Sequence, residues 1–338
     1  MSAHFPLRRA SRVALLVAGV ALVAFFAWSL WAPAGQQEVA CLVTVPRGDS
    51  VGEVAGELGD LGLIRSPAAF QLAAYATGKW RRLQAGVYEL TPRMSTLEIL
   101  DALCRGRLKA SRLVIIPEGY TIAQIARQLD RAGALAAEEF TAVAESGGIA
   151  VDPGFPLPKG SLEGYLFPDT YRIDLSESAQ EVAAQMLRRF REVVWQGLLH
   201  GKAPPGGLHQ TIILASLVEA EAKHDRERPV IAGVLANRLR RGMRLECDAT
   251  IQYALGEDRK ARLTHQDLQV DSEYNTYRHE SLPPGPICSP GLPSIKAAMD
   301  PAQVPYLYYV ARPDGTHLFS TTYAEHQAAI ARARRGRG

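Results

Sequence analysis

The hydrophobic positions of the chain begin as an unbroken run and become periodic afterwards. Residues 13–32 read VALLVAGVALVAFFAWSLWA and contain no charged side chain. At 1.5 Å of rise per residue, a helix of this length spans about 30 Å, the hydrocarbon thickness of a bilayer. Because no side of this helix is polar, the pattern predicts a transmembrane helix rather than a helix of a soluble domain.

The charges around this run predict its orientation. Arg8, Arg9 and Arg12 precede it, and no basic residue follows until Arg47. The positive-inside rule therefore leaves a tail, residues 1–12, in the cytoplasm and sends the body of the protein across the cytoplasmic (inner) membrane after a linker, 33–40. A cleaved signal peptide is the alternative, since residues 32–34 loosely match a small-x-small cleavage site. The run exceeds the roughly 7–15 apolar residues of a signal peptide, which favours a single-pass anchor.

A sequence repeat follows the linker. Residues 43–58 and 114–129 align without gaps, with five of sixteen positions identical. Each copy predicts a short strand, a Pro-x-Gly turn and an amphipathic helix capped by Ser50 or Thr121. The apolar stripes fall at positions 51, 54, 55 and 58, and at 122, 125, 126 and 129. Further helices are expected over 66–77 and 137–146, and a second strand over 86–90. The pattern resembles the start of a LysM module, a small glycan-binding fold, although a plain structural role is equally compatible with it.

The segment LEGYLFPDTY, residues 162–171, gathers aromatic and acidic residues around a glycine and a proline. Its composition predicts loop and strand rather than helix. Aromatic rings beside carboxylates suit sugar recognition, and Glu163, Tyr165 and Asp169 are the candidates. An aromatic-rich turn of the core has the same composition.

A helix predicted over 210–223 carries two acids. Glu219 shares its side of the helix with small residues, which leaves space for a ligand, whereas Glu221 lies about 200° away among leucine and valine side chains. Apolar neighbours favour the protonated form of either acid, as a general acid requires. Spacing alone does not choose between them, and two surface glutamates are the simpler explanation. A second helix is expected after Asp225, its N-cap, and ends at Gly242.

Overall composition excludes several classes of protein. The chain has 338 residues, 47% of them hydrophobic, and 38 basic against 35 acidic residues leave a formal charge of +3. Scattered basic residues with this balance argue against a nucleic-acid partner. The eight histidines show no metal-binding spacing, so neither a metal nor another cofactor is expected. Four cysteines in an exported domain allow the disulfides 41–104 and 247–288, with buried free thiols as the alternative.

Several motifs in order along the chain resemble one family. The run ILASLVEAEAKHDRERPVIAGVLANRLRRGMRLECDATIQYALG, then YNTY at 274–277 and LPPGPI at 282–287, resemble the YceG-like family of endolytic murein transglycosylases. The resemblance also takes in the 162–171 segment and covers the ectodomain. It implies that Glu219 is the catalytic residue. It further implies substrate-binding roles for Glu163, Tyr165, Asp169, Glu221, Asn237, Asp248, Thr250, Asn275 and Tyr277. Cysteines at 247 and 288 depart from the family pattern, which slightly favours a disulfide between them.

The resemblance implies a lyase that cuts MurNAc–GlcNAc bonds of nascent peptidoglycan strands. The C6 hydroxyl of muramic acid attacks, so a single carboxyl group serves first as acid and then as base. The alternatives are a hydrolase that uses Glu219 with Asp248 or Glu221, and a glycan-binding scaffold that recruits wall synthases. The expected fold is α+β: the anchor, LysM-like strand–helix modules over 41–110 and 111–175, and a mixed α/β catalytic domain over 176–338.

Overall fold

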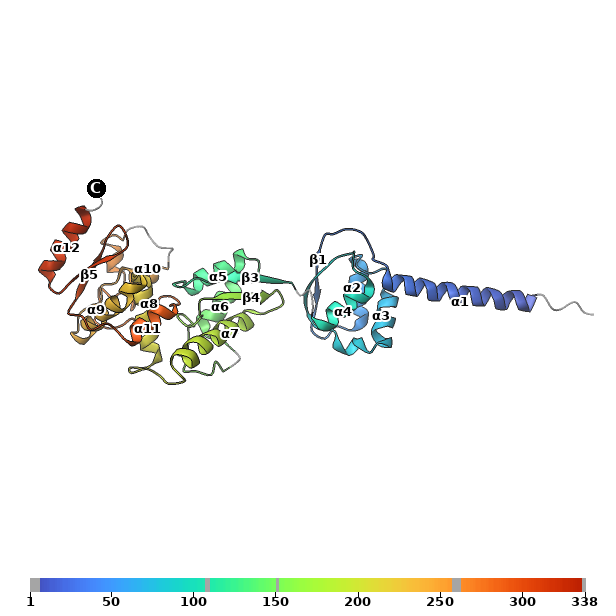
Figure 1. The fold of residues 1–338 in the computed structure, drawn as a ribbon, viewed down its shortest axis with the longest axis horizontal. Helices are drawn as coiled ribbons and strands as arrows, with labels where there is room; N and C mark the ends of the chain where they lie inside the picture. The colour runs from blue at the N-terminus through green and yellow to red at the C-terminus, as the bar shows by residue number, and fades with distance from the viewer. Residues whose placement is uncertain (1–6, 107–109, 150–151, 257–262, 336–338) are drawn as a thin grey trace, which may run out of the picture. The chain divides into compact units, whose positions relative to one another are not determined.

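A computed structural model describes residues 7–106, 110–149, 152–256 and 263–335 of the protein. Its helices and short two-stranded sheets (Figure 1) confirm the expected mixed α+β class. The chain divides into two compact units. The first runs to Arg112 and includes Asp174–Ser176, and the second holds the remainder.

The first unit opens with the long helix α1 (Leu7–Trp31). The segment Ala14–Trp31 has a mean hydropathy of 2.2 and is almost wholly exposed, so it is long and apolar enough to cross a bilayer. Helix α1 takes in part of the expected cytoplasmic tail, while residues 1–6 lie outside the described ranges.

The C-terminal end of α1 is bonded to the rest of the first unit. Thr96 Oγ1 donates a hydrogen bond of 2.9 Å to the Ser29 carbonyl. Arg65 Nε donates one of 2.9 Å to the Pro33 carbonyl, and its guanidinium lies 4.2 Å from the ring centroid of Trp28. These contacts fix the end of the helix against the small domain that follows it.

That small domain is a strand–helix–helix–strand unit with one added helix. Its elements are β1 (Cys41–Val45), α2 (Val51–Asp60), α3 (Pro67–Ala76), a 3-10 turn η1 (Lys79–Arg82), β2 (Gly86–Leu90) and α4 (Thr96–Arg105). Strands β1 and β2 are antiparallel, with Val43 opposite Tyr88, and their inward side chains pack on the helices. The expected strand over 86–90 is therefore confirmed.

The second unit begins with the other copy of the repeat. Strand β3 (Ser111–Ile115), α5 (Ile122–Arg131), α6 (Ala137–Ser146) and β4 (Thr170–Asp174) repeat the order strand, helix, helix, strand, and β3 pairs with β4. Ser50 and Thr121 cap α2 and α5, each within a full capping box, as expected. All eight residues of the two apolar stripes are buried.

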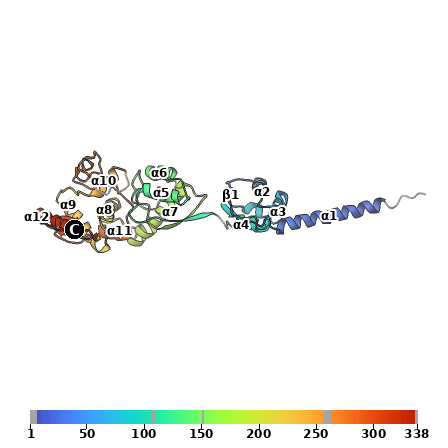
Figure 2. The same cartoon turned by 90° about the horizontal axis from the view of Figure 1, so that it is seen from above.

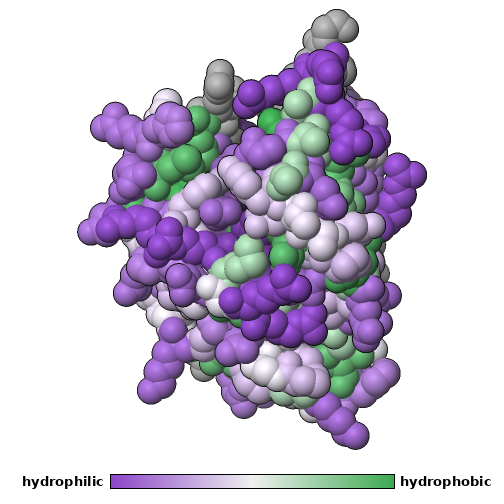
Figure 3. Space-filling model, turned by 90° about the vertical axis from the view of Figure 1, so that its left-hand side faces the viewer, coloured by the Kyte–Doolittle hydropathy of each residue, from purple (hydrophilic) through white to green (hydrophobic). Residues whose placement is uncertain are grey.

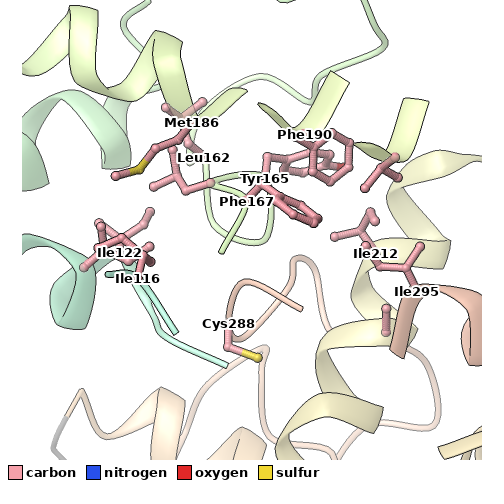
Figure 4. Packing of buried hydrophobic residues seen from close by; sticks show 14 of the residues in the cluster. Ile116, Ile122, Leu162, Tyr165, Phe167, Met186, Phe190, Ile212, Cys288 and Ile295 are labelled. Atoms are coloured by element: carbon pink, nitrogen blue, oxygen red, sulfur yellow. The ribbon is translucent and has the colours of Figure 1, made fainter. Parts of the chain in front are cut away.

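Helix α7 (Ala179–Phe190) and a π-helical segment η2 (Arg191–Leu198) follow. Figures 1 and 2 show α5, α6 and α7 grouped together. The core beneath them is rich in aromatic residues, and Figure 4 shows Tyr165, Phe167 and Phe190 meeting within it.

The C-terminal part of the second unit is built around a buried helix. Its elements are α8 (Leu208–Glu221), a 3-10 turn η3 (Asp225–Glu227), α9 (Arg228–Arg240), α10 (Asp248–Ala254), a 3-10 turn η4 (Asp267–Gln269), α11 (Leu292–Met299), β5 (Tyr308–Ala311), β6 (His317–Ser320) and α12 (Tyr323–Arg335). Strands β5 and β6 form an antiparallel hairpin. The face seen from the side of α12 is mostly hydrophilic, with small apolar patches (Figure 3).

Two expectations about this region need correction. Asp225 does not cap α9 but starts the turn η3, and its carboxylate accepts a hydrogen bond of 2.9 Å from Arg228 Nε. All four cysteines are free thiols, so the free-thiol alternative holds, the slightly favoured disulfide 247–288 is wrong and the possible disulfide 41–104 is not formed. The Cys247 thiol points to the Leu245 carbonyl and the Cys288 thiol to the Ser216 carbonyl, which directs the two sulfur atoms to different backbone groups.

Candidate active site

Glu219 lies in the last turn of α8, where the helix leaves the core. The helix is buried on all sides from Thr211 to Val218, because its residues are almost all apolar and leave no solvated stripe. Only the final turn reaches polar surroundings. There the side chain of Glu219 keeps 7% of its surface exposed. The fold therefore places a carboxylate at the edge of the core.

Two groups hold the Glu219 carboxylate. Arg228 Nη1 lies 3.1 Å from Oε1, and the backbone N–H of Gly291 donates a hydrogen bond of 3.0 Å to Oε2. Arg228 is itself fixed, since it donates to Asp225 at 2.9 Å and to the Ser294 hydroxyl at 2.5 Å. Helices α8, α9 and α11 thus meet at this carboxylate, and a positive charge and an N–H dipole both face it.

A cavity of about 280 Å³ opens beside Glu219. Its wall includes a second acid, Glu118, from the turn between β3 and α5. That turn is fastened to the segment before α11: the Gly119 N–H donates to the Ser289 carbonyl and the Ser289 N–H to the Tyr120 carbonyl, both at 2.8 Å. Partial desolvation of the Glu118 carboxyl, together with the nearby charge of Glu219, raises its pKa, although the side chain as a whole is exposed.

Sequence reasoning missed Glu118. The repeat contained a signal that could have identified it, because the two copies differ in charge at one position of the Pro-x-Gly turn. The first copy has Arg47 where the second has Glu118. A difference of charge within otherwise matched turns marks the position where only one copy carries an acid.

Glu163 lies beside the neighbouring cavity, of about 340 Å³. This cavity shares Thr121, Gln124, Gln252 and Tyr253 with the cavity at Glu219, so the two are contiguous. Glu163 is 4% exposed. Its Oε2 accepts hydrogen bonds from the Ile122 N–H at 3.1 Å and the Tyr253 hydroxyl at 3.4 Å, while Oε1 has no partner among the described residues. Burial raises the pKa of Glu163 to about 8, so its carboxyl group is protonated at neutral pH.

The two other candidates of the 162–171 segment lie elsewhere. Tyr165 is fully buried, stacks on Phe155 and hydrogen bonds to His209 Nδ1 at 2.9 Å. Its ring belongs to the core shown in Figure 4. Asp169 forms an ion pair of 2.5 Å with Arg189. Neither residue lines the cavities beside Glu219 and Glu163.

Glu221, Asp248 and Tyr277 line a separate cavity of about 490 Å³, toward β5 and α12. The Tyr277 hydroxyl donates a hydrogen bond of 2.5 Å to Asp248, and burial raises the pKa of Tyr277. Glu219 is absent from the wall of this cavity. The two acids of α8 therefore serve different cavities, as their angular separation on the helix requires.

Three candidates are tied into the backbone. Asn237 donates to the carbonyls of Val304 and Tyr306, at 2.7 and 2.9 Å. Thr250 is fully buried and donates to the Cys247 carbonyl at 2.8 Å. Asn275, also fully buried, donates to the carbonyls of Leu268 and Val270, at 3.1 and 2.8 Å. These contacts hold loops in place, and none of the three residues lines the cavity of Glu219.

The cavity of Glu219 therefore offers proton-transfer chemistry. Two carboxyl groups in different electrostatic surroundings line this cavity. Such a difference in surroundings lets one carboxyl group act as an acid and the other as a base. Within the described ranges, no three His, Cys, Asp or Glu side chains are grouped so that they could hold a metal ion.

Comparisons with known proteins assign the family. A model of the YceG-like family matches residues 43–332. An endolytic murein transglycosylase of Bacillus subtilis is 31% identical over 300 residues, 85% of this chain and 83% of the relative. One of Streptococcus pneumoniae serotype 2 is 31% identical over 318 residues, 86% of this chain and 57% of the relative. The solved structure of a yceG-like protein of Listeria monocytogenes superimposes with a TM-score of 0.56 and 32% identity, over 86% of this chain and 98% of that one. The chain belongs to the YceG-like family.

Proposed function

We propose that the protein is an endolytic murein transglycosylase, a lyase that cleaves MurNAc–GlcNAc bonds within nascent peptidoglycan strands and so ends their elongation. Its relatives in Bacillus and Streptococcus carry this name. The observation that carries the proposal is the position of Glu219. Its nearly buried carboxylate is held by Arg228 and by the Gly291 N–H and faces a cavity.

Glu219 is the catalytic residue in this proposal. A lytic cleavage needs a proton on the departing glycosidic oxygen and a base for the C6 hydroxyl of muramic acid. That hydroxyl then bonds to C1 and closes a 1,6-anhydro ring, so no water enters the product. The Arg228 guanidinium and the Gly291 N–H keep the Glu219 carboxylate oriented while the C6 hydroxyl proton moves to it.

The contiguous cavities supply the binding site for the glycan. The cavity at Glu219 adjoins the cavity at Glu163 along a shared wall that includes Gln252 and Tyr253, and we assign both to the glycan. The protonated Glu163 lines the second of these cavities. Glu221, Asp248 and Tyr277 face the separate cavity, where they either contact a more distant part of the strand or only support the fold. The remaining candidates have a structural role and keep the fold around the cavities in place: Tyr165, Asp169, Asn237, Thr250 and Asn275.

The arrangement of the chain follows from the same proposal. Helix α1 anchors the protein in the cytoplasmic membrane with residues 1–12 inside the cell. Two LysM-like modules, 41–110 and 111–175, lie outside the membrane before the catalytic domain, 176–338. The support for these modules is the repeated order of strand, helix, helix and strand. Peptidoglycan synthases that make the nascent strands are the expected protein partners.

The test is the product of the reaction. Full-length protein in detergent is incubated with purified glycan strands, and the fragments are analysed by mass spectrometry. We expect fragments that end in 1,6-anhydro-MurNAc, and a loss of at least about 10²-fold in rate for Glu219→Gln, the usual contribution of acid–base catalysis.

Glu139→Gln is the matched control, because Glu139 is an exposed glutamate of α6 outside both cavities. It should cleave like the wild type. Reducing MurNAc ends would show a hydrolase and contradict the lyase. Unchanged cleavage by Glu219→Gln would remove the catalytic assignment and favour a glycan-binding scaffold.

A further inference from the structure

Two acids that are about a hundred residues apart in sequence converge on one glycine. The Gly291 N–H donates to Glu219 Oε2 at 3.0 Å. A Cβ atom at Gly291 would overlap the carboxyl group of Glu118, and one at Gly119 would lie 3.6 Å from Glu219 Cγ. The absence of a side chain at Gly291 therefore leaves the Glu118 carboxyl the place that it occupies beside the N–H that binds Glu219. Both acids line the cavity of about 280 Å³.

The surroundings of the two acids differ. Glu219 faces the Arg228 guanidinium and a backbone N–H, and both favour negative charge on it. Glu118 receives no hydrogen bond or ion pair among the described residues, and the partial burial of its carboxyl and the charge of Glu219 raise its pKa. Arg228 opposes this effect but does not reverse it. Glu118 therefore keeps its proton to higher pH than an ordinary glutamate does.

The repeat gives an independent indication that Glu118 is not needed for the turn itself. Residues 46–48 and 117–119 form matched turns, each followed by a capped helix. The first turn carries Arg47 at the position of Glu118, and both side chains are exposed. A structural requirement for a carboxyl group at this position would apply to both copies.

We propose that Glu118 is the proton donor of the reaction and that Glu219 is its base. The Glu118 carboxyl gives its proton to the glycosidic oxygen as the bond from that oxygen to C1 of MurNAc breaks. The Glu219 carboxylate takes the proton of the C6 hydroxyl as the C6 oxygen bonds to C1. A proton then passes from Glu219 back to Glu118, so the enzyme is restored and no water is consumed. This inference rests on the proposed function and divides between two acids the work that Glu219 would otherwise do alone.

The experiment compares leaving groups. Full-length wild type, Glu118→Gln, Glu219→Gln and the control Glu139→Gln are assayed on purified glycan strands and on a peptidoglycan tetrasaccharide with p-nitrophenol at C1 of its terminal MurNAc. Nitrophenolate leaves without a proton, so this substrate does not need an acid. We expect Glu118→Gln to lose at least about 10²-fold on glycan strands but less than about tenfold on the aryl substrate. Glu219→Gln should lose activity on both substrates.

A second readout is the pH profile on glycan strands. The alkaline limb of kcat/KM in the wild type should disappear or move in Glu118→Gln, because the group whose deprotonation causes it is gone. Cleavage of glycan strands by Glu118→Gln within about threefold of the wild type overturns the inference. Equal losses on both substrates also overturn it, since they indicate a structural role. A wild type that makes no anhydro ends contradicts the proposed function instead, which keeps the two failures distinguishable.

Discussion

Arg228 Nη1 lies 3.1 Å from Glu219 Oε1, and the two side chains keep only 8% and 7% of their surface exposed. A nearly buried charge pair of this kind connects α8 to α9 at the point where both meet the cavity. Removal of one partner leaves the other charge without compensation in a poorly solvated place. The stability of the fold and the position of the carboxylate therefore depend on the same contact.

We accordingly expect Arg228→Met to lower the free energy of unfolding by about 3–5 kcal/mol, the usual cost of breaking a buried pair. Glu219→Gln/Arg228→Met should lose less than the sum of the single changes, because neither charge of the buried pair remains, and Asp225, the other partner of Arg228, is exposed. Urea unfolding of the four proteins measures both quantities. Strict additivity would show that the pair contributes no coupling energy.

The raised pKa of Glu163 predicts that the stability of the protein depends on pH. This pKa is about 8 in the fold and near 4.3 in the unfolded chain. Between these values the native state holds a proton that the unfolded state has lost, so the free energy of unfolding falls as pH rises. The contribution is fully present below the unfolded pKa and is lost as pH passes about 8.

Glu163→Gln should remove this dependence, which amounts to a few kcal/mol as an order of magnitude. Chemical unfolding from pH 5 to pH 8.5 measures it, and Glu139→Gln should keep the slope of the wild type. Parallel stability curves for Glu163→Gln and the wild type would refute the raised pKa.

Gly291→Ala should affect activity more than stability. Gly291 has a φ of −74°, which any residue adopts, so the backbone tolerates a side chain. The new methyl group would instead displace the end of the Glu118 side chain. We expect cleavage to fall at least about tenfold, with a change below about 1 kcal/mol in the free energy of unfolding.

Gly56→Ala serves as the control for Gly291→Ala, since a Cβ atom at Gly56 in α2 meets nothing within 4 Å. It should cleave at the rate of the wild type. A Gly291→Ala protein with full activity would count against a role for Glu118 in the reaction.

In contrast to Gly291→Ala, Asn237→Ala should lower stability more than activity. The Asn237 amide donates hydrogen bonds to the carbonyls of Val304 and Tyr306. Loss of these two hydrogen bonds leaves the carbonyl oxygens without this donor. We expect a loss of about 1–3 kcal/mol in unfolding free energy and an unchanged kcat at temperatures where the variant stays folded. A lower kcat in the folded variant would give Asn237 a role at the substrate.

The helices of the repeat could be predicted from sequence because their signals are local. Ser50 and Thr121 each precede an apolar stripe of helical period, so both helices were expected with their caps. The catalytic role proposed for Glu219 depends instead on the family resemblance, whose motifs extend over the ectodomain.

The rest of the site depends on contacts between distant segments. Glu118 lines the same cavity as Glu219 because the turn after β3 is hydrogen-bonded to Ser289, far along the chain. Glu221 is two residues from Glu219 but faces another cavity, since a helix turns about 200° over two residues. Tyr165 follows Glu163 equally closely, yet it is core, as the composition of the segment also allowed.

The Pro-x-Gly turn also bears on how this chemistry can change over evolutionary time. The same turn accepts arginine at 47 and glutamate at 118, each exposed and each followed by a capped helix. The fold therefore tolerates either residue at this position, and a substitution there can add or remove an acid while the turn and the helix after it stay the same. A duplicated module of this kind can keep one copy as a structural part while the other acquires a reactive group.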